Sequence, residues 1–240
     1  MTTVVAIGCS HTYGTMLDGK QSSSLFNLNN SYAGCLAKKH NCKFINLSQP
    51  GGSNEFIFRV AIDWLTRHRK RDEDYIVLIG WTSPFRMETR YPEDSEYEHT
   101  TISKIDMKYF PISLGQGPEI ARVKEFQRLH SICPLIFETT KDFDLWATYA
   151  FNLQQLFTKN KVKYLMFNTC QELAYTENNQ SVIDSLNTKL YINPLTKNEN
   201  FLERSLRKGF VKTECWHLKL DAHLEYASYL SKIVVDLDYF

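Results

Sequence analysis

The sequence has almost no excess of charge of either sign. It contains 28 Lys and Arg residues against 27 Asp and Glu residues, so the formal net charge is +1 over 240 residues. A dedicated nucleic-acid-binding protein needs Lys and Arg in excess on one face, so this balance argues against that class. The densest basic run, residues 67–71, is followed at once by three acidic residues, 72–74, which favours a solvated helix end over an anion-binding patch.

Long apolar runs and a leader sequence are also missing. No run approaches the roughly 20 apolar residues of a membrane helix, and the N-terminus has no basic segment followed by an apolar run and a cleavage site. We therefore expect a cytoplasmic protein without a membrane partner. The six cysteines are scattered without a Cys-x-x-Cys pair, which argues against a zinc knuckle or a thioredoxin-like site and predicts reduced thiols.

What the sequence does contain is an alternation of strands and helices. Strands are predicted at 4–7, 43–47, 75–81 and 162–168, and helices at 31–40, from Ser53 or Asn54 to the charge run, within 119–159, and at 217–235. The run 75–81 is apolar throughout, which is typical of a parallel strand covered on both faces. The pattern predicts a single α/β domain with a mainly parallel sheet. Two polar, irregular segments, at about 86–118 and 178–209, are predicted to be insertions.

In parallel α/β sheets, sites form outside the carboxyl ends of the strands. Ser10 directly follows the first predicted strand, where its hydroxyl would project from the sheet and its own N–H would face a developing oxyanion. A serine nucleophile needs a histidine base, and the base needs an acid to orient it. Near the C-terminus, Glu214 and His217 are three residues apart. A second register, with His223 as the base, and a plain helix cap with a surface histidine both remain open.

Four blocks spread over the chain together resemble the SGNH (GDSL) hydrolase family. They are Gly-Cys-Ser-His-Thr-Tyr-Gly at 8–14, Asn-Leu-Ser-Gln-Pro-Gly-Gly-Ser-Asn at 46–54, Ile-Gly-Trp-Thr-Ser at 79–83 and Glu-Cys-Trp-His at 214–217. The resemblance implies a three-layer α/β/α sandwich of the flavodoxin-like kind. It also implies a serine esterase in which Ser10 is the nucleophile, His217 the base and Glu214 the residue that orients the base.

The resemblance further implies an oxyanion hole made of Ser10, Gly52 and Thr82, with Gly51 as the second choice for the glycine. Three positions depart from the family pattern: Cys9 replaces the first-block Asp, Thr82 the third-block Asn, and Glu214 the last-block Asp. A threonine hydroxyl can donate one hydrogen bond but is shorter than the amide. The loss of one oxyanion donor costs on the order of 10²–10³ in rate.

Four further residues are predicted to bind substrate. They are His11, which follows the nucleophile, and Asn54, Trp81 and Arg86, which follow or end predicted strands. Each has a simpler interpretation as a helix-start residue, a cap, a core aromatic or a solvated loop charge, and these alternatives remain open.

The predicted activity is hydrolysis of small acyl esters, acetyl above all, of a carbohydrate or other polyol. The predicted partner is therefore a small-molecule or glycan ester, with no metal or organic cofactor required. Two alternatives remain: transfer of the acyl group to an acceptor hydroxyl by the same residues, and a binding or structural module that keeps only the fold. The wording at 79–83, with His217 and Leu218 opening a helix, is also similar to SGNH-like proteins encoded by tailed phages.

Overall fold

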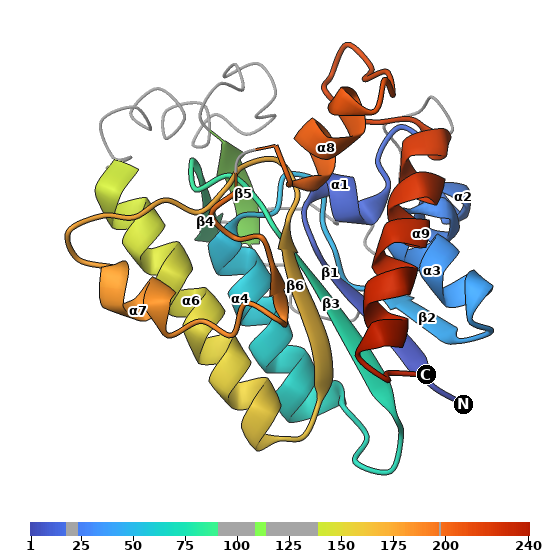
Figure 1. The fold of residues 1–240 in the computed structure, drawn as a ribbon, viewed down its shortest axis with the longest axis horizontal. Helices are drawn as coiled ribbons and strands as arrows, with labels where there is room; N and C mark the ends of the chain where they lie inside the picture. Colours follow the sequence, from blue (N-terminus) through green and yellow to red (C-terminus); the bar gives the residue numbers. More distant parts are fainter. Residues whose placement is uncertain (18–23, 91–108, 114–138, 197) are drawn as a thin grey trace.

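A computed structural model describes residues 1–17, 24–90, 109–113, 139–196 and 198–240. Its centre is a five-stranded sheet in the order β2-β1-β3-β6-β7, in which every neighbouring pair of strands is parallel (Figure 1). The strands are β1 (Thr3–Gly8), β2 (Lys43–Asn46), β3 (Tyr75–Trp81), β6 (Lys163–Asn168) and β7 (Tyr191–Ile192). The predicted mainly parallel α/β fold is confirmed.

Helices cover both faces of this sheet and make it the middle of three layers. One face carries α1 (Ser10–Tyr13), α2 (Leu25–Asn30), α3 (Tyr32–Lys39), α8 (Phe201–Arg207) and α9 (Leu220–Asp236). The other carries α4 (Asn54–Asp63), the π-helical turn η1 (Trp64–His68), α6 (Thr139–Lys159) and α7 (Gln180–Asp184). Successive residues of β1 alternate between the two cores: Val5 and Ile7 pack with α4 and α6, and Val4 and Ala6 pack with α3 and α9.

The strand order fixes where a site can form. When the five strands are numbered one to five along the chain, their order across the sheet is 2-1-3-4-5, which is the flavodoxin-like arrangement. The direction of winding changes between β1 and β3. The register pairs Gly8 with Gly80 and Trp81 with Asn168, so the carboxyl ends of β1, β3 and β6 lie side by side. The residues that follow these three strands therefore share one edge of the sheet.

The two segments predicted to be irregular insertions contain regular elements. Residues 178–209 hold α7 and α8 and also supply β7, the edge strand of the main sheet. In the first segment, β4 (Arg86–Arg90) pairs antiparallel with β5 (Tyr109–Ser113), while 91–108 and 114–118 lie outside the described residues. Strands this short carry too few residues to show a period in the sequence.

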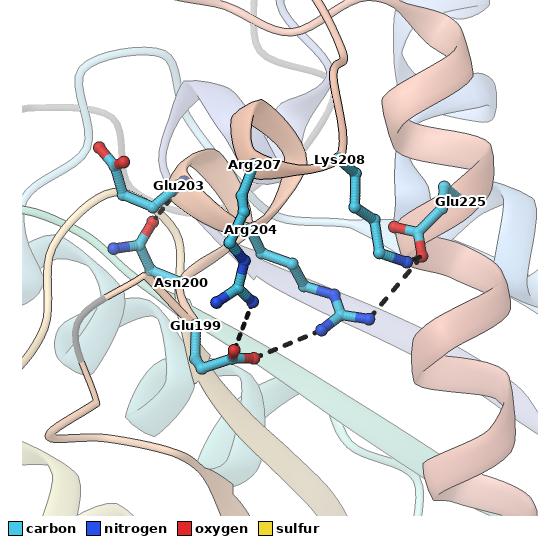
Figure 2. A network of polar contacts seen from close by, with 7 residues as sticks. All are labelled: Glu199, Asn200, Glu203, Arg204, Arg207, Lys208 and Glu225. Atoms are coloured by element: carbon cyan, nitrogen blue, oxygen red, sulfur yellow. Dashed lines mark hydrogen bonds and ion pairs between the residues drawn. The ribbon is translucent and has the colours of Figure 1, made fainter.

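Helix α8 is held against α9 by a network of charged side chains (Figure 2). Arg204 Nη1 lies 3.3 Å from Glu199 Oε2, and its Nη2 lies 3.8 Å from Glu225 Oε1 on α9. The Arg204 guanidinium also stacks on the ring of Tyr229, 3.9 Å from the centroid. Arg207 also pairs with Glu199, and Lys208 pairs with Glu225, so each of these two carboxylates has two cationic partners.

Candidate functional site

The turn after β1 presents Ser10 at the edge of the sheet. Strand β1 ends at Gly8, and Ser10 opens α1 with its side chain largely buried. A Cβ on Gly8 or Gly80 would lie 2.1 Å or 2.4 Å from Thr12 Oγ1, so this glycine pair makes room for the Thr12 hydroxyl. That hydroxyl accepts a hydrogen bond of 2.7 Å from Tyr32 Oη. Helix α1 can sit this close to the sheet only because both paired positions are glycine.

A tight turn before α9 holds His217. Thr213 N–H donates to His217 O at 2.7 Å, and His217 N–H donates to Thr213 Oγ1 at 3.1 Å. The His217 ring lies 5.2 Å from the ring of His11, which brings it to the first turn of α1. Burial and the nearby Arg86 guanidinium lower the pKa of His217 to about 4, against a smaller opposing effect of a hydrogen bond with the Cys215 backbone. The imidazole is therefore neutral at pH 7, as a general base must be.

The side chain beside Nδ1 of His217 is Cys215, whose Sγ lies 3.3 Å away. The same sulfur lies 3.2 Å from Thr213 Oγ1. The predicted orienting residue, Glu214, is exposed, and no hydrogen bond joins it to His217 among the described contacts. Cys215 thus occupies the position beside His217 that is predicted for Glu214.

His223, the alternative base, has a different surrounding. It is 1% exposed on α9, and its Nδ1 accepts the backbone N–H of Tyr32 at 3.0 Å. Its ring stacks on the Tyr32 ring, and burial followed by the field of His217 lowers its pKa to about 3. These contacts join α3 to α9, so His223 is a structural residue between two helices.

Of the three predicted oxyanion donors, the Gly52 N–H is engaged elsewhere and the Thr82 hydroxyl contacts a thiol. Gly52 N–H donates to Gln49 O at 3.0 Å, within the loop that follows β2. Thr82 N–H donates to Asn54 Oδ1 at 2.9 Å, and the Thr82 hydroxyl lies 3.6 Å from Cys170 Sγ. The buried Nε2 of Gln49 has no hydrogen-bond partner, and the backbone N–H of that residue donates to Gly8 O, next to the Ser10 turn.

The four predicted substrate-binding residues separate into two pairs. Both ends of the Asn54 amide are hydrogen-bonded to the Thr82 backbone. Asn54 Oδ1 accepts from the Thr82 N–H, and Asn54 Nδ2 donates to the Thr82 carbonyl at 3.1 Å. Trp81 is fully buried in the core on the α4 and α6 face. The Asn54 amide is thus engaged with Thr82, although the residue lines a cavity with Arg86, and Trp81 packs in the core, so substrate binding by these two residues stays a prediction. The His11 ring, in contrast, lies beside that of His217, and the charge of Arg86 lowers the pKa of both rings.

Two thiols lie at the same edge. Cys9 Sγ is 3.4 Å from Thr169 Oγ1, and that hydroxyl is 3.8 Å from Cys170 Sγ. Burial raises the pKa of the Cys9 thiol, but Arg86 and hydrogen bonds from Thr169 and Thr82 together lower it below its ordinary value. Thr169 and Cys170 are not among the predicted site residues, although they directly follow a predicted strand. No cluster of three or more His, Cys, Asp or Glu side chains suited to a metal ion occurs in the part of the chain that is described.

A family model matches residues 18–181, which is more than half of the chain. It describes a family of unknown function, DUF6071. The chain belongs to the DUF6071 family. The matched residues include the loop after β2 and the start of β4, and they exclude Ser10 and His217. No curated protein matches this DUF6071 sequence.

Solved structures share the fold of this DUF6071 chain at low sequence identity. A carbohydrate esterase family 2 enzyme with a carbohydrate-binding domain, from Corynascus thermopiles (Myceliophthora fergusii), has a TM-score of 0.53 and 11% identity over 98% of this chain and 66% of its own. A family two carbohydrate esterase from Clostridium thermocellum, in complex with cellohexaose, has a TM-score of 0.50 and 13% identity over 99% and 65%.

A third structure is a carbohydrate esterase whose active site has divergent catalytic and non-catalytic binding functions. Its TM-score is 0.51, with 10% identity over 98% of this chain and 68% of its own. The DUF6071 chain thus spans about two thirds of the length of these esterases. The likeness shows that the chain shares the α/β fold of these esterases, whereas the similarity to phage-encoded proteins stays a prediction. No helix in the described ranges combines the length and hydropathy needed to cross a membrane.

Proposed function

We propose that the protein is a serine esterase of the SGNH type that hydrolyses small acyl esters of a carbohydrate or other polyol. The observation that carries the proposal is the meeting of two segments about 200 residues apart. The ring of His217 lies 5.2 Å from that of His11, the residue after Ser10, at the edge where the winding of the sheet changes direction. Ligand sites of parallel α/β folds form at this edge.

In the proposed reaction, the Ser10 hydroxyl attacks the acyl carbon while His217 takes its proton. His217 then gives that proton to the leaving alcohol, which leaves an acyl group on Ser10 Oγ. Water attacks this acyl carbon while His217 takes its proton; the bond to Oγ breaks, the proton returns to Ser10, and the acyl group leaves as the carboxylic acid. A pKa of about 4 keeps His217 able to accept a proton at pH 7. Glu214 is the acid that the sequence offers for orienting the ring, and the contact of Cys215 with Nδ1 makes that thiol the stronger candidate.

The oxyanion that forms in each step needs preorganised donors. Ser10 N–H is proposed as the first donor. Gly52 N–H already donates within the protein and the Thr82 hydroxyl contacts the Cys170 thiol, so the unpartnered Gln49 Nε2 amide is the better candidate for the second. This assignment leaves Thr82 the role of a bridge between Asn54 and the thiols.

A second candidate function is ligand binding without turnover. Two observations favour it: the Gly52 N–H already donates to Gln49 O, and a carbohydrate esterase with a similar fold has an active site with a non-catalytic binding function. In that case the Ser10 edge would bind an ester or a glycan and release it unchanged.

The deciding experiment follows hydrolysis of p-nitrophenyl acetate, butyrate and octanoate, together with the intact mass after a fluorophosphonate probe. An esterase is expected to turn over acetate fastest and to gain one probe adduct. Both signals should vanish in Ser10→Ala and persist in Ser185→Ala, because Ser185 is an exposed serine next to α7. A folded wild type that neither reacts nor hydrolyses would overturn the esterase proposal in favour of the binding module.

A further inference from the structure

Among the buried polar atoms that have no hydrogen-bond partner, two belong to residues that interact with His217, one by ring contact and one by its charge. They are Nη1 of Arg86 and Nδ1 of His11. Buried polar groups in folded proteins are nearly always hydrogen-bonded, so each exception calls for an explanation. Both atoms belong to residues at the carboxyl edge of the sheet, where the proposed reaction takes place, and a bound ligand is the explanation that their position favours.

Within the described ranges, no ion pair joins Arg86 to a carboxylate. The acidic residue nearest to it on β4 is Glu88, whose carboxylate is held by both Nε and Nη2 of Arg59, at 3.0 and 2.8 Å. Glu88 is 4% exposed in this pair, so it is not available to Arg86. Glu55 and Asp142 line a cavity of about 200 Å³ together with Arg86, but no ion pair joins Arg86 to a carboxylate among the described residues.

The charge of Arg86 lowers the pKa values of several ionisable side chains at this edge of the sheet. Burial first, and then His217 and Arg86, lower the pKa of His11 well below its ordinary value. Arg86 also opposes the effect of burial on the thiol pKa values of Cys9 and Cys170. Arg86 is partly buried, with Nη1 fully so, and a positive charge in such a setting is stabilised by a partner of opposite sign. The protein supplies none in the described region.

We propose that Arg86 and His11 form a subsite for an anionic group, a carboxylate or a phosphate, that the ester substrate carries close to its scissile bond. The planar fork of Arg86 matches two oxygens of either group, and the neutral His11 ring adds one N–H donor. That the bound anion is part of an ester substrate rests on the proposed esterase function. The subsite itself is a binding property and is tested separately from hydrolysis.

The first test measures binding without turnover. In Ser10→Ala, succinate and inorganic phosphate are titrated by calorimetry at constant ionic strength, with chloride as the reference anion. Saturable binding of at least one anion is expected, and which of the two binds more tightly decides between carboxylate and phosphate. Arg86→Met should abolish the binding, Arg86→Lys should weaken it roughly tenfold because the fork is lost, and Arg67→Met should leave it intact. Arg67 is the matched control because it is exposed, at 74% of its side chain.

The second test compares two esters of equal acyl length on wild type. The p-nitrophenyl monoester of succinic acid carries a carboxylate, and p-nitrophenyl butyrate does not. We expect kcat/KM to favour the anionic ester about tenfold or more, and the preference to fall to about one in Arg86→Met but to persist in Arg67→Met. An equal loss for both esters would mean that Arg86 acts on the oxyanion or on folding, which would overturn the subsite.

The two tests separate the two proposals. If phosphate or succinate binds in an Arg86-dependent way but wild type hydrolyses neither ester, the esterase fails and the anion subsite stands. If the neutral ester is hydrolysed but neither anion binds and no preference is seen, the subsite fails and the esterase stands. NMR titration of His217 checks the placement, because its pKa should rise in Arg86→Met when the nearby positive charge is removed.

Discussion

At the scale of single residues, the turn at 213–217 decides which side chain meets the histidine. Trp216 has a φ of 66°, a left-handed conformation that bulky residues rarely adopt. Lys212 Nζ lies over its ring, 2.7 Å from the centroid, and Thr213 closes the turn by pairing with His217. The chain reverses over these residues, which leaves Cys215 beside the imidazole and Glu214 in solvent.

This geometry makes a prediction about Cys215. Replacing it with Ala should lower kcat on the order of tenfold and change KM less, because Nδ1 of His217 loses the contact that fixes the ring. Cys215→Ser should restore part of the loss, since a hydroxyl can also accept from Nδ1. The control is Glu214→Gln, for which we expect kcat within about twofold of wild type. Steady-state kinetics on p-nitrophenyl acetate checks both, and a larger loss in Glu214→Gln would return the role to the carboxylate.

The same residues show which contacts of the candidate site the sequence can predict and which it cannot. Ser10 and His217 follow from strand ends and block spacing, which depend on the order of elements. The neighbour of Nδ1 depends on a positive φ at Trp216, which no propensity for a bulky residue would suggest. The engagement of the Asn54 amide depends on its pairing with Thr82, 28 positions away. Such contacts arise only after folding.

At the scale of elements, α8 links the site to the layer formed by α3 and α9. Phe201 opens this helix, and its ring lies 6.0 Å from that of His11 and 4.9 Å from that of His223. The charged network around Arg204 fixes the other side of α8 to α9 (Figure 2). A change at Arg204 should therefore loosen the helix that packs against His11.

Replacing Arg204 with Met should lower the free energy of unfolding by about 1–2 kcal/mol, because Glu199 and Glu225 would lose a shared, largely buried cation. Arg207→Met should cost at most about 0.5 kcal/mol, since Arg207 is 55% exposed and pairs at the surface. Urea unfolding measures both, and hydrogen exchange should show faster exchange in α8 for Arg204→Met alone. Equal effects of the two variants would contradict the assigned role of the network.

How far the sequence predicts an element depends on how local its causes are. The strand 75–81 is predicted to the residue because seven apolar positions in a row identify a strand buried on both faces. The start of α4 is predicted because Ser53 caps it by accepting from Phe56 N–H at 3.1 Å. Strand β7 has only two residues and exists through pairing with β6, so no local signal marks it.

At the scale of the whole molecule, the sheet separates two cores that meet different chemistry. The α4 and α6 side is filled by apolar and aromatic residues. The α3 and α9 side holds, beside its apolar core, two buried histidines, His11 on α1 and His223 on α9, and His217 lies in the turn before α9. Protonation would place positive charge in or next to this one layer, so the layer should be the acid-sensitive part of the fold.

The sign of the effect follows from linkage. The pKa of His223 is lowered to about 3 and that of His217 to about 4 in the folded protein, against about 6.5 for an unfolded chain. The unfolded state therefore binds protons that the folded state does not, so stability is full above about pH 6.5 and is lost as the pH falls toward the folded values. Each histidine contributes at most about 1.4 kcal/mol per pH unit in that window.

Urea unfolding at pH 7.0 and 5.0 should show this loss. His223→Asn, whose Oδ1 can still accept the Tyr32 N–H, should reduce the difference by about one histidine's share. An unchanged difference would show that protons bind elsewhere first.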